Sequence, residues 1–206
     1  MILIGRLLSP FVRRVLVTLN VHGIACQRNP LTTASDGDAI GKMNPLRRVP
    51  ALVLDDGEAL IDSIVILDYL DDLVGPERAL IPVSGVERRN ALKLLSLAVG
   101  VAEKGVVAHY EKNRRPQDKF WGQWFDGCSA QALAGLAALE QAAPDDGGWL
   151  AGPKMSQVDI TTAVTYEFIN VVLPDLIGVD DYPCLKALVA RLNEIEAYSS
   201  THPSTE

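Results

Sequence analysis

Hydrophobic positions in the first third of the chain follow strand and helix spacings in turn. An apolar run at residues 1–4 ends at Gly5, and residues 26–29, bounded by Pro30, form a weaker strand candidate. Between them lies a helical stripe whose members are three and four residues apart, formed by Val12, Val15, Leu16 and Leu19. Gly23 is placed to end that helix. The pattern predicts a strand, a helix and a second strand.

A loop, a hairpin and another helix are predicted next. Residues 32–44 are rich in Thr, Ser, Asp, Gly and Asn, which is typical of a loop with one irregular helical turn. Residues 51–54 and 58–61 flank an Asp-Asp-Gly turn at 55–57, where glycine readily takes the positive φ that a hairpin needs. The apolar stripe of a following helix is formed by Ile64, Leu67, Leu70 and Val74.

Glycine and proline mark a boundary near residue 75. Gly75-Pro76 stops the preceding helix, and Pro82 holds the next residues extended, which is typical of a linker. We therefore expect one domain at residues 1–75, a linker at 76–84 and an all-helical domain at 85–206.

Helical spacing dominates the second part of the chain. Further helices are expected over residues 118–142, from near Ser156, and over 183–198, with a frayed polar tail after them. A seam able to pack in a helical bundle is formed by Leu92, Leu95, Val99, Ala102 and Val106. The inward positions expected for the last two helices are Ile160, Val164, Phe168 and Val171, then Leu185, Leu188, Leu192 and Ile195.

Composition and charge narrow the class of protein. Of the 206 residues, 48% are hydrophobic, which is enough to bury a core. Nineteen Lys and Arg against 26 Asp and Glu give a net charge of −7, which disfavours nucleic acid as a partner. No apolar stretch approaches the roughly 20 residues of a membrane helix, and Arg6 interrupts the N-terminal apolar run. We expect a cytoplasmic protein that binds neither nucleic acid nor membranes.

The cysteines and histidines indicate no metal site. Cys26, Cys128 and Cys184 are widely separated and lack a CxxC pattern, which favours free thiols over a disulfide framework or zinc. The three histidines are also scattered along the chain. Neither a metal nor a catalytic triad is predicted, and the role of the cysteines stays open.

Two segments at the ends of predicted strands have both a structural and a chemical interpretation. Ser9 followed by Pro10 is a good helix start, yet a hydroxyl at a helix N-terminus also suits an anion such as a thiolate. Val49-Pro50 opens the hairpin, and the sequence by itself does not imply a cis bond there. If the bond is cis, the Val49 backbone is free to pair with an extended peptide.

A third segment, Asp62-Ser63, lies between the hairpin and the next helix. Ser63 is either an N-cap with Asp62 beside the helix dipole, or the pair recognises an amino-acid head group. In the second case Asp62 binds the ammonium and Ser63 the carboxylate. Ser156-x-x-Asp159 is interpreted as a structural capping box.

Together these segments resemble the soluble glutathione transferase superfamily over essentially the whole chain. The resemblance rests on the order and spacing of Ser9-Pro10-Phe11, the run from Asn44 to Leu52, and Asp62-Ser63, followed by a helical second half. The Ser-Pro-Phe-Val-Arg segment is most similar to bacterial members. The resemblance implies a thioredoxin-like α/β N-terminal domain, an all-α helical-bundle C-terminal domain, a cis Val49-Pro50 bond and a homodimer.

The same resemblance implies roles for the residues of the first domain. Ser9 matches the catalytic serine that hydrogen-bonds the sulfur of glutathione. Val49, beside Pro50, matches the residue whose backbone pairs with the cysteinyl unit. Asp62 and Ser63 match the acidic residue and serine that hold the γ-glutamyl group.

Basic residues before the hairpin complete this candidate site. Arg48 lies where many members place Lys or Gln near the tripeptide, and Lys42 is a looser candidate for the glycyl carboxylate. Both belong to a basic cluster with Arg47 that is otherwise a solvated loop face. Two departures leave the glutathione affinity open, because Asp62 is shorter than the more widespread Glu, and Arg47-Arg48 replaces Gly-Lys or Gly-Gln. The electrophile pocket is assigned by position alone to Phe11, Val106, Tyr110 and Arg114.

The predicted activity is transfer of glutathione, a co-substrate, to small hydrophobic electrophiles in detoxification, with Ser9 activating the thiol as thiolate. A glutathione-dependent isomerase, dehalogenase or peroxidase fits the same residues. A non-catalytic binding or regulatory protein is the alternative from another class, although a scaffold would not need Ser9, Val49-Pro50 and Asp62-Ser63 together. A thiol–disulfide reductase is disfavoured because serine occupies the active position. The sequence does not identify the electrophile.

Overall fold

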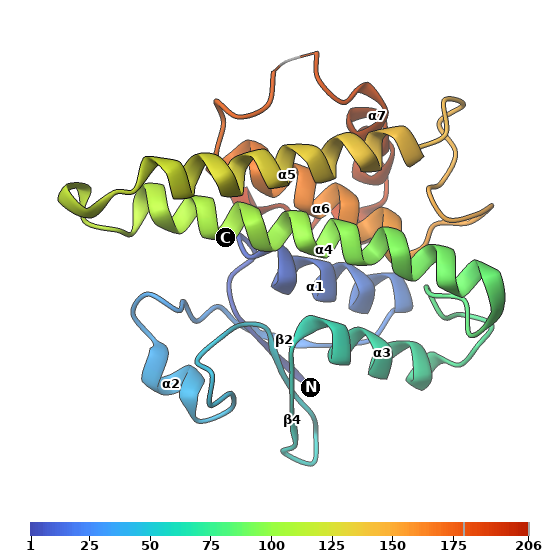
Figure 1. The fold of residues 1–206 in the computed structure, drawn as a ribbon. Helices are drawn as coiled ribbons and strands as arrows, with labels where there is room; N and C mark the ends of the chain where they lie inside the picture. Colours follow the sequence, from blue (N-terminus) through green and yellow to red (C-terminus); the bar gives the residue numbers. More distant parts are fainter. Residues whose placement is uncertain (179, 206) are drawn as a thin grey trace. The chain divides into compact units, whose positions relative to one another are not determined.

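The chain forms two compact units in a computed structural model that describes residues 1–178 and 180–205. The first unit comprises Met1–Val83 with Leu192–Glu206, and the second comprises Ser84–Arg191 (Figure 1). This division differs from the expected one at the C-terminal end, because the segment from Leu192 onward is grouped with the first unit and not with the helical one.

The first unit contains a four-stranded sheet. Its strands are β1 (Ile2–Ile4), β2 (Gln27–Asn29), β3 (Ala51–Val53) and β4 (Ala59–Ile61), in the spatial order β2-β1-β3-β4. β1 pairs parallel with β2 and antiparallel with β3, and β3 pairs antiparallel with β4. The predicted hairpin is confirmed, and Gly57 at its turn has a φ of 92°, which glycine adopts without a Cβ clash.

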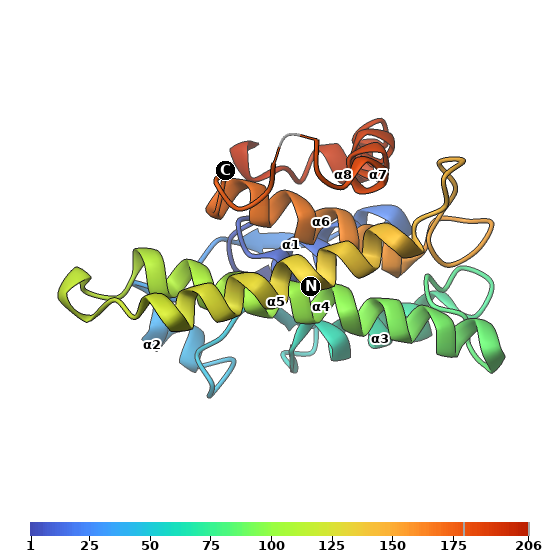
Figure 2. The ribbon, with the colours of Figure 1, turned by 45° about the horizontal axis from the view of Figure 1, so that its top comes forward.

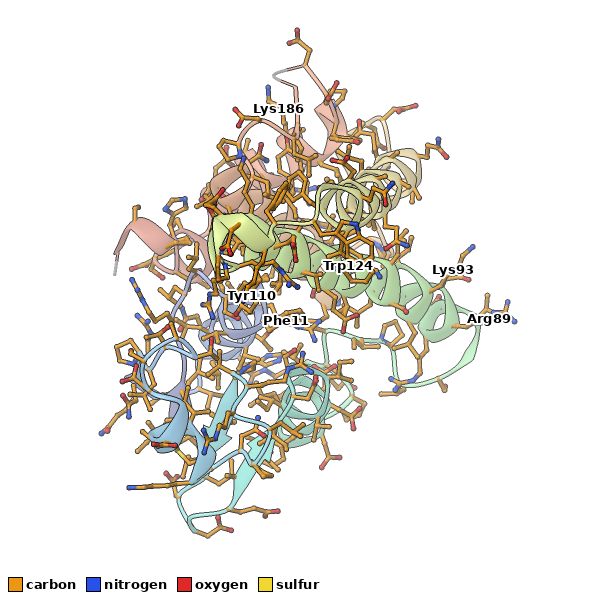
Figure 3. All side chains as sticks on the ribbon, turned by 60° about the vertical axis from the view of Figure 1, so that its left-hand side comes forward. Phe11, Arg89, Lys93, Tyr110, Trp124 and Lys186 are labelled. Atoms are coloured by element: carbon orange, nitrogen blue, oxygen red, sulfur yellow. The ribbon has the colours of Figure 1, made fainter. Side chains whose placement is uncertain are left out.

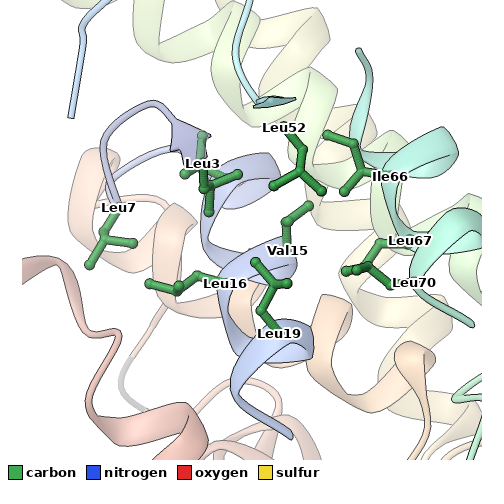
Figure 4. Close-up of a cluster of buried hydrophobic side chains, with 10 residues drawn as sticks. Leu3, Leu7, Val15, Leu16, Leu19, Leu52, Ile66, Leu67 and Leu70 are labelled. Carbon is green, nitrogen blue, oxygen red and sulfur yellow. The ribbon is translucent and has the colours of Figure 1, made fainter. Parts of the chain in front are cut away.

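Helices cover both faces of this sheet. They are α1 (Pro10–His22), α2 (Gly37–Gly41) and α3 (Ser63–Val74). Leu3 and Leu52 pack into one core cluster with residues of α1 and α3 (Figure 4), whereas Ile4 and Ala51 pack with Ile40 of α2. Because successive strand residues point to opposite faces, α1 and α3 lie on one face of the sheet and α2 on the other.

The buried face of α3 differs from the predicted stripe. Ile64 is 57% exposed, whereas Ile66, Leu67 and Leu70 are buried. The helix begins at Ser63, which is itself buried, and positions three, four and seven residues further on share its face. The expectation that Ile64 faces the core is therefore wrong.

The C-terminal segment of the first unit packs on α1. The expected single helix over 183–198 is instead two helices, α7 (Pro183–Asn193) and α8 (Glu196–Ser199), because Ile195 between them has an extended backbone. Tyr198 and Thr201 are fully buried. The Arg13 guanidinium lies 4.6 Å from the centroid of the Tyr198 ring and its Nε donates to Thr201 Oγ1 at 3.2 Å. These contacts order the tail that was expected to fray, and a short 3₁₀ helix, η2 (Pro203–Thr205), follows.

The second unit is built from helices. They are α4 (Gly85–Asn113), the 3₁₀ helix η1 (Gln117–Lys119), α5 (Gly122–Ala142) and α6 (Gln157–Val172), followed by most of α7. Figures 1 and 2 show α4 and α5 side by side over much of their length, with α6 beside them. The predicted capping box of α6 is confirmed. The Ser156 side chain accepts a hydrogen bond from the backbone of the first helical turn, and the Asp159 side chain accepts one from the Ser156 backbone amide.

Small residues form much of the buried face of α4. Ala91, Ala98 and Gly105 are buried, whereas Leu92 of the predicted seam is 40% exposed. Val171 at the end of α6, expected to point inward, is also exposed. Both expectations are wrong. At Leu92 the reason is that close helix packing places small side chains at the contact, and the larger ones lie beside it. None of the helices in the described part of the chain has the length and apolarity that a membrane crossing requires.

Candidate functional site

Strand register brings the predicted site segments to one end of the sheet. Ile4 pairs with Ala51, and Ala51 pairs with Ile61, so these three residues form one row across β1, β3 and β4. The positions just beyond this row are Gly5, Pro50 and Asp62. The helices α1 and α3 follow β1 and β4, so they begin at this same end. Ser9, Val49-Pro50 and Asp62-Ser63 are therefore gathered around two helix N-termini.

Ser9 is the N-cap of α1, so the structural interpretation of the Ser9-Pro10 segment is confirmed. Its Oγ accepts a hydrogen bond from Val12 N at 3.4 Å, and Pro10 occupies the first helical turn. This distance is long for an N–H···O bond, and the Val12 amide also donates to the Ser9 carbonyl at 3.1 Å. The Ser9 hydroxyl is half-buried and keeps its hydrogen for another acceptor.

The Val49–Pro50 peptide bond is cis, and the chain packs tightly around it. Gly5 has a φ of 125°, a region that strongly favours glycine. A Cβ on Gly5 would lie 2.9 Å from Val49 Cβ and 2.6 Å from Val12 Cγ2. Gly5 thus lets the end of β1 approach the side chains of Val49 and of Val12 in the first turn of α1.

Asn44 shapes the loop that leads to Pro50, a role that the sequence analysis did not assign. Its buried side chain donates from Nδ2 to the Arg48 carbonyl at 2.9 Å and accepts from Leu46 N at 3.0 Å. Asparagine before proline is a turn signal, and that signal was available in the sequence. The two hydrogen bonds fix the path of the backbone immediately before Val49.

The basic residues of this loop are exposed. Arg47 has a φ of 53° and forms an ion pair with Asp38 at 3.0 Å, which directs it toward α2. Lys42 is the C-cap of α2, and Arg48 lies next to Val49. A positive φ favours glycine, so Arg47 adopts this backbone conformation at some energetic cost.

The Asp62-Ser63 pair begins α3 in a different way from the predicted cap. Asp62, and not Ser63, is the N-cap, and its Oδ1 accepts from Ile64 N at 2.9 Å. Asp62 is exposed and has φ 67° and ψ 134°, a region that non-glycine residues rarely occupy. Ser63 is only 2% exposed, and its Oγ accepts a hydrogen bond from Arg14 Nη2 at 2.7 Å.

The remaining candidates are distributed over both units. Phe11 lies in the first turn of α1, in the first unit, and is half-buried. Val106, Tyr110 and Arg114 follow one another at helical spacing at the end of α4, in the second unit. The Arg114 guanidinium lies 3.9 Å from the centroid of the Tyr110 ring, a cation–π contact. Figure 3 labels Phe11 and Tyr110.

Burial is the largest cause of the pKa shifts of His109, Cys26 and Asp159. Burial lowers the pKa of His109, whose Nδ1 lies 3.0 Å from the Asn113 amide nitrogen. Burial raises the pKa of the Cys26 thiol and of the Asp159 carboxyl; hydrogen bonds from Ser156 and Leu150 oppose the shift of Asp159. Within residues 1–178 and 180–205, no group of three His, Cys, Asp or Glu side chains is placed to hold a metal ion.

Known proteins match this chain in both sequence and structure. Two family models match: glutathione S-transferase, N-terminal domain, over residues 3–78, and glutathione S-transferase, C-terminal domain, over residues 122–191. A glutathione transferase family member from Pseudomonas fluorescens Pf-5, crystallised with bound glutathione, is 34% identical, with 98% of each chain covered and a TM-score of 0.87.

Two curated relatives extend the comparison. The maleylacetoacetate isomerase of Pseudomonas aeruginosa is 27% identical over 203 residues, which cover 94% of this chain and 91% of that protein. The uncharacterized GST-like protein YibF of Escherichia coli K12 is 34% identical over 113 residues, which cover 54% of this chain. That match spans 55% of the length of YibF.

The sheet order, the helices on its two faces and the helical second unit define a thioredoxin-like domain joined to an all-α domain. The chain belongs to the glutathione S-transferase family.

Proposed function

We propose that the protein is a glutathione transferase in which Ser9 stabilises the glutathione thiolate for attack on a small hydrophobic electrophile. The observation that carries the proposal is the strand register, which gathers the Ser9, Val49-Pro50 and Asp62-Ser63 segments at one end of the sheet. The glutathione bound to the Pseudomonas fluorescens relative supports it. Glutathione is the co-substrate, and the proposed chemistry uses no metal.

Each part of the tripeptide finds a group of matching chemistry in the first unit. The exposed Asp62 carboxylate suits the γ-glutamyl ammonium, and Ser63 with the N-terminus of α3 suits the γ-glutamyl carboxylate. The backbone of Val49 pairs with the cysteinyl unit. Arg48, with Lys42 as the looser candidate, supplies positive charge for the glycyl carboxylate.

The magnitudes allow Ser9 to act without a general base. A cysteine thiol has a pKa of about 8.5, and lowering it by about two units requires roughly 2.7 kcal/mol of preferential thiolate stabilisation. A hydrogen bond to a charged group contributes about 1.5–3 kcal/mol, and the N-terminus of α1 adds roughly 0.3–1 kcal/mol. The thiol proton is released to solvent, and the thiolate sulfur forms a bond to the electrophilic carbon. The leaving group, a halide in the case of an aryl halide, departs with its bonding electron pair, and Ser9 keeps its own proton.

Phe11 in the first unit and Val106, Tyr110 and Arg114 in the second stay the proposed candidates for contact with the electrophile. An exposed aromatic ring beneath a guanidinium suits a planar or partly anionic substrate. A glutathione-dependent isomerase is the second candidate, because the relatives include a maleylacetoacetate isomerase that is 27% identical over an alignment covering 94% of this chain. Both candidates need the same thiolate.

The proposal is tested by titrating the protein with glutathione in a calorimeter and then assaying conjugation of an aryl halide by the wild type and Ser9→Ala. We expect saturable binding by both proteins and a lower rate for the variant. An absence of binding at millimolar glutathione would remove the enzymatic function. An unchanged rate in Ser9→Ala would leave the binding site and remove the catalytic role of Ser9.

We also propose a cytoplasmic homodimer. The family resemblance supports the dimer, and light scattering in solution tests it. A mass of twice the 22.3 kDa chain is expected, and the mass of a single chain at micromolar concentration would contradict it.

A further inference from the structure

Two arginines are buried side by side in the sequence of α1, and they make different contacts. Arg13 and Arg14 are each 1% exposed. Arg14 Nη2 donates to Ser63 Oγ at 2.7 Å, which links α1 to the first residue of α3. A buried guanidinium needs an environment that compensates its charge, and the hydrogen bond to Ser63 is one of the contacts of Arg14.

The Arg14–Ser63 hydrogen bond fixes the polarity of the Ser63 hydroxyl. A guanidinium carries donors and no acceptor, so Ser63 Oγ must accept from Arg14. The one hydrogen of that hydroxyl therefore points away from Arg14 and is available to an acceptor. A carboxylate is an acceptor only, so this orientation of Ser63 is the one that binds a carboxylate.

The same contact anchors a strained corner. Asp62, immediately before Ser63, has φ 67° and ψ 134°. Such a conformation persists only where the surroundings fix it, and here the residues on both sides are held. Ile61 is paired in β4 with Ala51, and Ser63 is bonded to Arg14. The corner sets the directions in which Asp62 and Ser63 present their side chains.

Arg13 provides a natural comparison on the same helix. Its Nε donates to Thr201 Oγ1, and its guanidinium lies over the Tyr198 ring, so these two contacts are with the C-terminal segment. Arg13 and Arg14 are equally buried, and of these two side chains Arg14 is the one hydrogen-bonded to Ser63.

We propose that Arg14 is a positioning residue for the γ-glutamyl carboxylate of glutathione: it orients the Ser63 hydroxyl as a donor and places a buried positive charge behind the N-terminus of α3. The inference rests on the proposed function, since it assumes that glutathione occupies this end of the sheet. Arg14 acts through Ser63 and is not assigned a contact with the reacting sulfur.

The test compares Arg14→Met with Arg13→Met, since methionine is apolar and fills much of the same space. Calorimetry measures binding of glutathione and of γ-aminobutyryl-cysteinyl-glycine, which is glutathione without its γ-glutamyl carboxylate. Arg14→Met is expected to weaken glutathione binding roughly tenfold, the loss typical of a hydrogen bond that supports a charged ligand. Its affinity for the analogue should equal that of the wild type, and Arg13→Met should change neither affinity.

Steady-state kinetics and a double-mutant cycle distinguish a positioning role of Arg14 from a purely structural one. KM for glutathione should rise in Arg14→Met, while kcat at saturating glutathione stays at the wild-type value. In a Ser63→Ala background, Arg14→Met should cause a smaller loss of glutathione affinity than in the wild type, because its partner is already absent.

The remaining outcomes separate a failure of the Arg14 role from a failure of the proposed function. Equal losses for both ligands, or equal losses in both arginine variants, would overturn the role of Arg14 and leave the proposed function intact. A wild-type protein that binds neither ligand would overturn the proposed function itself. If Arg14→Met does not fold, Arg14→Lys and Arg13→Lys carry the same comparison, because lysine lacks the planar fork of arginine. A selective loss at position 14 supports the inference, and equal affinities overturn it.

Discussion

Ser9 is the N-cap of α1 and is also the proposed partner of the glutathione sulfur. Its hydroxyl oxygen accepts from Val12 N at 3.4 Å, whereas Ser156 caps α6 at 3.2 Å within a complete capping box. The weaker cap at Ser9 is consistent with a hydroxyl whose main partner is a ligand. The two serines can therefore be separated by experiment.

We expect Ser9→Ala to reduce kcat/KM for glutathione conjugation roughly 10- to 100-fold, which is the size of one hydrogen bond to a charged group. Its free energy of unfolding should fall by less than about 1 kcal/mol. Ser156→Ala should show the reverse, a loss of about 1–2 kcal/mol with unchanged kcat/KM. Denaturant unfolding and steady-state kinetics measure both. If Ser9→Ala and Ser156→Ala lost equal stability and both kept the wild-type kcat/KM, Ser9 would act only as a helix cap.

His109 gives the protein a pH-dependent contribution to stability. Burial and the nearby Arg114 lower its pKa in the folded protein, while a hydrogen bond with the Val172 backbone opposes the shift. Because the folded pKa lies below the unfolded value of about 6.5, the unfolded chain binds more protons in this window. Stability is therefore complete above that value and falls as the pH drops through the folded pKa.

We expect the wild type to lose more stability than His109→Gln on going from pH 7.5 to pH 5. The difference should stay below about 1 kcal/mol, because the ring is only half-buried. Thermal unfolding at the two pH values measures it. Parallel losses in both proteins would show that the folded and unfolded pKa values of His109 are the same.

Local chemistry was readable from the sequence at some residues and hidden at others. Ser9 and Pro10 were placed correctly because a cap depends on adjacent residues. Ser63 was predicted as the N-cap of α3, and Asp62 occupies that position instead. The choice between them depends on the strained φ of Asp62 and on the hydrogen bond from Arg14 to Ser63. That bond joins residues 49 positions apart, and nothing in their spacing predicts it.

At the scale of elements, the contact between α4 and α5 requires a glycine, Gly135, which has no Cβ. A Cβ on Gly135 of α5 would lie 2.3 Å from Val101 Cγ2 of α4. Valine has one strongly preferred rotamer in a helix, so this methyl group has little room to move. Gly127 lies in the same helix, is exposed, and would have nothing within 4 Å of an added Cβ.

We expect Gly135→Ala to destabilise the protein by about 1–3 kcal/mol through overpacking, less what helix propensity returns. Gly127→Ala should stabilise it by about 0.5–1 kcal/mol, because alanine is the better helix former. Denaturant unfolding of the two variants measures the contrast. A stabilising effect at both positions would mean that α4 and α5 lie farther apart than the structure places them.

Helical periodicity located α4 but misjudged its buried face. The stripe was chosen by large apolar residues such as Leu92, whereas close packing selects small ones such as Ala91 and Ala98. Hydrophobicity alone does not encode how closely two helices approach. The hairpin of β3 and β4 was found with its turn because alternation and an Asp-Asp-Gly turn are local signals.

At the scale of the whole molecule, the fold class and the order of the two domains followed from the sequence, and the family match confirms them. The place of the C-terminal segment did not, because its polar tail carries no helical stripe. Its attachment to α1 depends on Tyr198 and Thr201 meeting Arg13, which is nearly the full length of the chain away.

We expect Tyr198→Ala to cost roughly 3 kcal/mol or more of unfolding free energy, since it empties a fully buried aromatic site. Phe120→Ala, at an exposed aromatic residue of the second unit, should change stability by less than about 0.5 kcal/mol. Denaturant unfolding compares them. Similar small effects in both variants would show that the C-terminal segment adds little to the first unit.

The central claim is that the Ser9 end of the sheet binds glutathione as a thiolate. The pKa of the bound glutathione thiol, measured from the ultraviolet absorbance of the thiolate as a function of pH, tests this claim most directly. We expect a value near 6.5 in the wild type, about two units below the free thiol, and a value closer to 8.5 in Ser9→Ala. A bound thiol that titrates near 8.5 in the wild type, or equally in both proteins, would contradict the account.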